Sequence, residues 1–135
     1  MGHQITWDNT DKTVVLQAYM VGASKDDLYH LARKSADMLN TVQHTVHLII
    51  DERNISLVLS STDMKYLAKS TPKNQGAVVM VVQPSKLAYK TAVQGLGKII
   101  GPQAFAQPYF VDSVETARQF LQDSFEVLYP SETTK

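Results

Sequence analysis

The feature that most constrains the fold is a short apolar run, Val46 to Asp51, which ends in an acidic residue. Such a run predicts a buried strand of a parallel sheet whose carboxyl end reaches solvent at Asp51. A helix start follows at Ser60, because its hydroxyl can accept a hydrogen bond from the first turn and Asp63 can reach back to it. Ligands of open α/β sheets bind beyond the carboxyl ends of the strands. We therefore expect the functional site between Asp51 and this helix start.

Composition excludes several classes of protein. A chain of 135 residues with 44% hydrophobic and 19% charged residues is typical of one globular domain. Thirteen basic and thirteen acidic residues balance, so no net field attracts nucleic acid. The absence of cysteine excludes disulfides and thiolate sites, and no apolar run approaches the roughly 18 residues of a membrane span. We expect a cytoplasmic protein with one domain over residues 1–130 and a polar tail over 131–135.

The N-terminal half predicts a strand pair followed by a helix. Residues 5–8 and 13–20 alternate as strands do, and the tight turn between them predicts an antiparallel pair. Ser24 is the expected cap of the next helix. The side chains expected to face the sheet recur at helical spacing: Leu28, Leu31, Ala32, Ser35 and Leu39. The same reasoning places Met64, Leu67 and Ala68 on the inner face of the helix that Ser60 begins.

The C-terminal half continues the alternation. Residues 77–83 are apolar on both faces and predict a covered strand, and residues 86–100 predict a helix that begins near Pro84. Residues 104–111 predict the last strand, and Pro108 within it favours the edge of the sheet, because proline donates no ladder hydrogen bond.

The last helix is expected to be capped by Asp112, with Glu115 as its capping-box partner. Its expected inner face is Val114, Ala117, Phe120 and Leu121. The expected order is therefore β-β-α-β-α-β-α-β-α, an α/β fold with a mixed, mostly parallel five-stranded sheet.

This order resembles the SpoIIAA-like family, which has the STAS or anti-sigma-factor antagonist fold. The resemblance extends from about residue 13 to about residue 121. It is carried by Val46–Asp51 with its serine-rich helix start, by residues 77–83, and by the stretch YFVDSVETA at 109–117. It implies a sheet wound as a β-α superhelix and a non-enzymatic regulatory module that binds another protein.

One serine matches the phosphoacceptor of the phosphorylated members of that family. In those proteins an Asp-Ser-Ser-Gly-like run begins the helix after the central strand, which makes Ser61 the matching position here. A helix N-terminus suits a phosphate chemically. However, Leu59 replaces the acid and Thr62 replaces the glycine. The alternative is that Ser60 is only the cap and Ser61 is an exposed first-turn residue, so we predict that Ser61 is not the principal switch.

The expected interaction surface combines this helix start with the loop before it. Ile55 and Leu57 make the loop partly apolar, and an exposed apolar patch commonly marks a partner site. The predicted surface is Asp51, Ile55, Leu57, Ser60, Thr62 and Asp63, and the predicted partner is a protein. A weak homodimer is the other assembly that we leave open.

Basic residues gather in one half of the chain. No acid occurs between Met64 and Val111, whereas six lysines do. Lys65, Lys86, Lys90 and Lys98 are candidates for a basic stripe that meets an acidic protein, a head group or a phosphate. The alternative is an ordinary solvated helix face.

Two other functions remain open. The superhelical architecture also resembles that of Sec14-type lipid-binding domains, which implies a carrier of an apolar or anionic ligand, with Phe105, Tyr109 and Phe110 flanking its chain. Acid–base catalysis would require Asp51, Glu52 and Asp63 to converge. No nucleophile or phosphate-binding glycine loop accompanies these carboxylates, so we expect no enzyme.

We also expect no metal and no cofactor. His44 and His47 are three residues apart at a strand entry, a spacing that places them on opposite faces, and no third ligand is near in the sequence.

Overall fold

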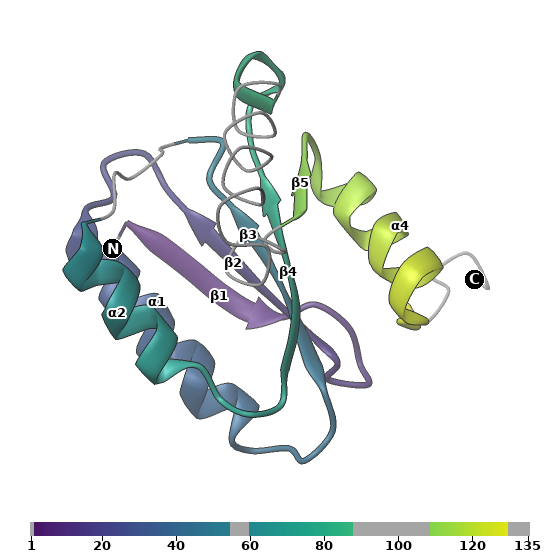
Figure 1. Ribbon diagram of the computed structural model, residues 1–135. Coiled ribbons are helices and arrows are strands. Elements are labelled where there is room, and N and C mark those ends of the chain that lie inside the picture. The colour runs from purple at the N-terminus through teal and green to yellow at the C-terminus, as the bar shows by residue number, and fades with distance from the viewer. Residues whose placement is uncertain (1, 55–59, 88–108, 130–135) are drawn as a thin grey trace, which may run out of the picture.

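The structure is a computed structural model that describes residues 2–54, 60–87 and 109–129. Its centre is a five-stranded sheet in the order β1-β2-β3-β4-β5 (Figure 1). β1 is antiparallel to β2, and every other neighbouring pair is parallel. The predicted mixed, mostly parallel sheet is therefore confirmed. The strands are β1 (His3–Trp7), β2 (Val14–Tyr19), β3 (Val46–Asp51), β4 (Gln75–Val81) and β5 (Tyr109–Val111).

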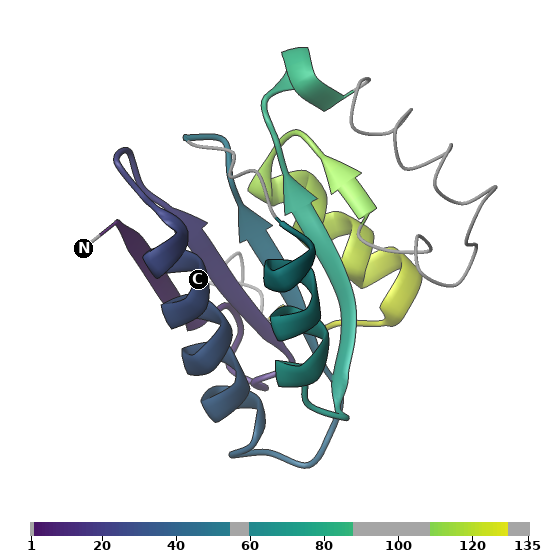
Figure 2. The same ribbon diagram turned by 60° about the vertical axis from the view of Figure 1, so that its left-hand side comes forward.

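Helices cover both faces of the sheet. α1 (Lys25–Leu39) and α2 (Ser61–Ser70) lie on one face, and α4 (Val114–Phe125) lies on the other (Figures 1 and 2). Each parallel connection steps to the next strand in the same direction, so right-handed connections place α1 and α2 on a common face. α4 follows the last strand and is free to cover the opposite face. Residues 84–87 are also helical, at the place where the sequence predicts a helix start.

Two apolar cores lie on either side of the sheet, because the side chains of each strand alternate between its faces. Val14, Ile49 and Val79 face α4 and pack with its buried residues Ala117 and Leu121. The predicted inner face of the last helix is thus confirmed. On the other face, Val15 and Leu48 pack with Leu39 of α1, and Tyr19 packs with Leu28 and Leu31.

The helix caps follow the sequence at two of three positions. Ser60 caps α2 through a complete capping box: the Asp63 N–H donates to the Ser60 hydroxyl at 3.1 Å, and the Ser60 N–H donates to the Asp63 carboxylate at 2.8 Å. Ser24 caps α1 in the same way. The prediction for α4 is wrong by one residue. Ser113 is the cap and accepts from the Thr116 N–H at 3.0 Å, because the chain is still extended at Ser113.

Other expectations need correction. Met64 is 54% exposed and Ala68 is exposed, so of the three residues expected to face inward from α2 only Leu67 is even half-buried. β4 begins two residues earlier than predicted. Its residues Val78 and Met80 are only half-buried, so β4 is not covered equally on both faces. A groove between α2 and the sheet leaves these two residues partly exposed.

Several expected features lie outside the described residues. They are the apolar loop residues Ile55 and Leu57, the stripe residues Lys90 and Lys98, the aromatic residue Phe105, the strand residue Pro108 and the tail 131–135. β5 is an edge strand, as the proline predicts.

A β-bulge interrupts the pairing of β3 with β4. Val46 pairs with Gln75 and Leu48 pairs with Val78, so two residues of β4 lie opposite His47 alone. The imidazole Nδ1 of His47 fills the irregularity and accepts a hydrogen bond from the Ala77 N–H at 2.9 Å. A Cβ atom at Gly76 would lie 2.5 Å from this nitrogen, so the close approach requires glycine.

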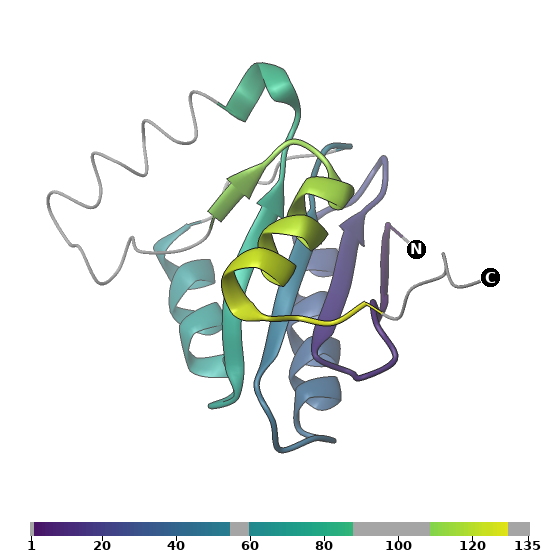
Figure 3. The same cartoon turned by 90° about the vertical axis from the view of Figure 1, so that its right-hand side faces the viewer.

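The segment after α4 runs back across the sheet toward the turn between β1 and β2 (Figure 3). There the Arg118 guanidinium makes two hydrogen bonds to the buried Asp8 carboxylate, at 3.0 and 2.7 Å. The Tyr129 hydroxyl donates to the same carboxylate. These contacts join the first twenty residues of the chain to the last described ones.

Candidate functional site

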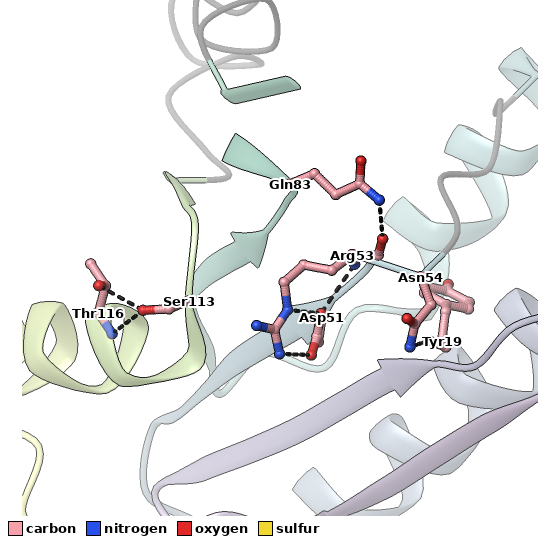
Figure 4. Close-up of polar contacts among 7 residues, drawn as sticks. All are labelled: Tyr19, Asp51, Arg53, Asn54, Gln83, Ser113 and Thr116. Atoms are coloured by element: carbon pink, nitrogen blue, oxygen red, sulfur yellow. Dashed lines mark hydrogen bonds and ion pairs between the residues drawn. The ribbon is translucent and has the colours of Figure 1, made fainter. Parts of the chain in front are cut away.

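The carboxyl end of β3 carries an ion pair that the sequence analysis missed. The Arg53 guanidinium donates two hydrogen bonds to the Asp51 carboxylate, at 3.0 and 2.8 Å (Figure 4). The Arg53 N–H donates to the same carboxylate at 3.1 Å. The hydrogen bond to Asp51 raises the pKa of Arg53 above its ordinary value. Asp51 therefore accepts all three bonds from Arg53, and its first role is to hold the turn after β3.

Neighbouring strands fix the same turn from both sides. The Gln83 side chain, which follows β4, donates to the Arg53 carbonyl at 2.7 Å (Figure 4). The Asn54 side chain donates to the carbonyl of Tyr19, the last residue of β2, at 3.3 Å. The start of the loop after β3 is thus tied to β2 and β4, while Ser113 and Thr116 pair with one another at the start of α4.

The three carboxylates considered for acid–base chemistry point in different directions. Side chains alternate along β3: Ile49 packs toward α4 and Ile50 packs toward α1. Asp51 therefore lies on the α4 side, whereas Glu52 lines a groove on the α1 side. Asp63 is occupied by the partners described next. The convergence that acid–base catalysis would require is therefore not observed for these three groups.

Asp63 is the anchor of α2. It is only 4% exposed and accepts hydrogen bonds from the Ser60 N–H, the Tyr29 hydroxyl and, at 2.7 Å, the Lys25 ammonium group. These donors, Lys25 first, hold the pKa of Asp63 well below its usual range. The hydrogen bond from the Tyr29 hydroxyl to Asp63 raises the pKa of Tyr29. Asp63 thereby links the first turn of α2 to the first turns of α1.

The rest of the helix start is exposed. Ser61, Thr62, Met64 and Lys65 all face solvent, and we call these four residues the α2 start surface. Ser61 thus lies where the sequence predicts, in an exposed first turn beside the cap. Of the residues expected in the basic stripe, Lys65 and Lys86 are exposed, whereas Lys90 and Lys98 lie outside the described residues.

α2 covers the sheet incompletely. Asp63 is its only buried residue, and a groove of about 510 Å³ separates α2 from α1 and the sheet. Its floor comes from β2, β3 and β4, and its sides come from α1, from α2 and from the residues that follow α2. The lining includes Gln17, Ser35, Leu48, Met64, Leu67 and Met80.

The sequence carried one signal for this groove. Ser35 on α1 and Gln17 on β2 are polar residues at positions that the periodicity places toward the helix–sheet interface. They are 4% and 5% exposed. A polar residue at such a position predicts either a hydrogen-bonded pair or a polar contact with a ligand.

The described part of the chain contains neither a cluster of potential metal ligands nor a membrane-spanning helix. Residues 2–54, 60–87 and 109–129 contain no cluster of three potential metal ligands. His44 bonds to the Lys12 carbonyl, and His47 bonds to β4. None of the described helices is both long enough and apolar enough to cross a bilayer.

Comparison with protein-family models, with curated proteins and with solved structures finds no match to this chain. The SpoIIAA-like resemblance therefore rests on the sequence features alone.

Proposed function

We propose that this chain is a non-enzymatic, STAS-like interaction module of the cytoplasm, with a SpoIIAA-like superhelical core, and that it binds a protein partner through the α2 start surface. The observation that carries this proposal is the attachment of the first turn of α2 to α1. Asp63 fixes the first turn to α1, so that Met64, 54% exposed, and its polar neighbours are presented on a rigid element. Binding to a rigid surface avoids the entropy cost of ordering it.

The arrangement of the acidic groups supports a role without catalysis. Asp51 is paired with Arg53, and Asp63 is buried among three donors. No described serine or threonine hydroxyl bonds to a histidine or carboxylate that would activate it as a nucleophile.

The same geometry disfavours a phosphate switch at Ser61. The carboxylate of Asp63 already accepts the Ser60 N–H at the N-terminus of α2. A phosphate on Ser61 would add about −1.5 to −2 charges beside this buried anion. Lys65, one turn further on, offsets only part of the repulsion because it is exposed. We expect phosphosite mapping of protein from its native host to find no stoichiometric phosphate on Ser61.

The proposal is tested by charge changes within the surface. Met64→Asp and Lys65→Glu should each lower the recovery of a co-purifying partner about tenfold or more, because a central contact contributes more than about 1.4 kcal/mol. Quantitative crosslinking in native host cytoplasm, followed by mass spectrometry, provides the measurement.

Leu128→Asp is the matched control, because Leu128 is 68% exposed and lies on the segment that follows α4. Light scattering on the pure chain separates a protein partner from a homodimer. An unchanged partner set in both α2 variants would rule the surface out.

A second candidate function, the carrier of a small ligand, is supported by a different feature from the one expected. Tyr109 packs against Phe120 and Phe125, with ring centroids 4.8 and 6.2 Å apart, so it belongs to the core beneath α4 and does not line the groove between α1 and α2. The groove between α1 and α2 is the observation that favours this function.

A further inference from the structure

We propose that the groove between α1 and α2 is a binding site for an uncharged, mainly apolar small molecule that carries one hydrogen-bonding group. α1 and α2 lie side by side over the same face of the sheet (Figure 2). The groove between them shares only Met64 with the α2 start surface; Ser61, Thr62 and Lys65 do not line it.

The size of the groove suits such a molecule. Its volume of about 510 Å³ lies within the range of about 300–1,000 Å³ that is usual for small-molecule sites. Protein interiors are otherwise packed as densely as organic crystals. Apolar side chains around an unfilled space lack the dispersion contacts of a packed core, and a bound ligand restores them.

The groove exists because of how its walls are built. Asp63 holds α2 at its N-terminal turn, and three of the four side chains that α1 contributes to the wall, Ala32, Ser35 and Ala36, are short. Val78 and Met80 on the floor consequently remain half-buried.

Two polar side chains define the hydrogen-bonding point. The Ser35 hydroxyl is buried and has no hydrogen-bond partner. Leu31 packs with Tyr19 and Leu39 packs with Val15, so Ser35, midway between these leucines, lies over Gln17. A buried hydroxyl without a hydrogen-bond partner destabilises the folded chain. A ligand hydroxyl, carbonyl or amide at this point would remove that penalty.

The charge of the lining selects against anions. Among the described residues, no lysine, arginine or histidine lines the groove, and its only charged side chain is Glu52. Burial, with Glu52 nearby, raises the pKa of the Tyr19 phenol, which therefore stays neutral. A carboxylate or phosphate in the groove would be desolvated without a counter-charge. The site therefore favours an alcohol over a fatty acid of equal length.

The experiment compares two molecules that differ only in charge. Nile red, an uncharged fluorescent dye, is added to the purified full chain as a reporter of binding in the groove. 1-Decanol and decanoate are then compared as competitors that displace the dye. We expect 1-decanol to displace the dye at least about tenfold more effectively than decanoate, because burying an unpaired charge costs more than about 1.4 kcal/mol. Amide chemical-shift changes on adding 1-decanol should concentrate on residues 28–36 and 64–72 and on the residues of β2, β3 and β4 that form the floor of the groove.

Two variants and a control locate the binding. Ala32→Leu fills the groove and should weaken 1-decanol binding about tenfold or more through steric exclusion. Ala68→Leu adds the same atoms to an exposed position of α2 that does not line the groove, so binding should not change. Ser35→Ala should weaken 1-decanol binding about fivefold through loss of one hydrogen bond, with no loss of thermal stability.

Three results would overturn the proposal. Decanoate that competes as well as 1-decanol would refute the uncharged class of ligand. Shift changes outside the groove would refute the site, even if Ala32→Leu failed to fold. Equal affinity of wild type, Ala32→Leu and Ser35→Ala would do the same.

Discussion

Three buried polar residues in this molecule differ in their role because they differ in their hydrogen-bond partners. The carboxylate of Asp63 has three donors and joins two helices, and the imidazole of His47 repairs an irregular strand pair. The hydroxyl of Ser35 has no partner and lines an open groove. All three are at least nine-tenths buried, so burial alone does not separate a structural residue from a binding residue.

Adjacent serines at the start of α2 should differ in their contribution to stability. Ser60→Ala removes the acceptor for the Asp63 N–H and should lower the free energy of unfolding by about 1 kcal/mol. Ser61→Ala changes an exposed side chain and should stay within about ±0.5 kcal/mol. Urea unfolding of the two variants provides the measurement. Equal losses in both would show that the cap does not stabilise this helix.

At the scale of elements, the pairing of β3 with β4 depends on one ring nitrogen. The bulge leaves the Ala77 N–H without a strand partner, and the neutral imidazole of His47 accepts it at 2.9 Å. Burial lowers the pKa of His47 below its ordinary value of 6.5, because the charged ring is poorly solvated there. Protonation would also replace the acceptor by a second donor.

Stability should therefore fall as the solution is acidified. The unfolded chain binds the proton on His47 more readily than the folded chain does. The contribution of His47 to the free energy of unfolding is therefore complete above pH 6.5 and is lost as the pH falls toward the lower pKa of the folded state. Urea unfolding at about pH 7.5 and about pH 5.5 should show a larger loss for the wild type than for His47→Gln, whose side chain does not titrate. Parallel losses in the two proteins would contradict the assignment.

At the scale of the whole molecule, the two ends of the chain are held together through Asp8. Arg118 of α4 and Tyr129 beyond it both bond to this carboxylate, whose side chain is only 3% exposed. Burial and the hydrogen bond to Asp8 raise the pKa of Tyr129, so its hydroxyl remains a donor. Asn9 adds a hydrogen bond to the Leu128 carbonyl at 2.9 Å.

Removing this carboxylate should weaken the entire fold. Asp8→Ala should lower the free energy of unfolding by about 2 kcal/mol, less than the roughly 3–5 kcal/mol of a fully buried pair because the Arg118 side chain is 36% exposed. Asp51→Ala is the matched control. It removes an equally bidentate pair with Arg53, but this pair joins residues only two apart, and the Arg53 side chain is 42% exposed. We therefore expect the free energy of unfolding to fall by at most about 1 kcal/mol. Chemical unfolding of both variants distinguishes them, and an equal loss would show that the long-range pair has no special role.

Local sequence signals determined the elements of this protein. The apolar run at β3 has the bounds that the sequence predicts, and Ser24 and Ser60 cap their helices as expected. The inward positions of α4 follow from spacing alone, with Ala117 and Leu121 fully buried. These features depend on residues within one or two turns of each other, so the chain specifies them without reference to the rest of the fold.

Only the tertiary structure decided the contacts between elements. No local pattern pairs Asp8 with Arg118, 110 residues away, or directs Asp63 to Tyr29 and Lys25. Periodicity predicts that Ser35 faces the sheet, but not that α2 remains too distant to close the space beside it. The physical reason is that spacing along a chain determines which face of an element is apolar, whereas the distance between two elements depends on every side chain that separates them.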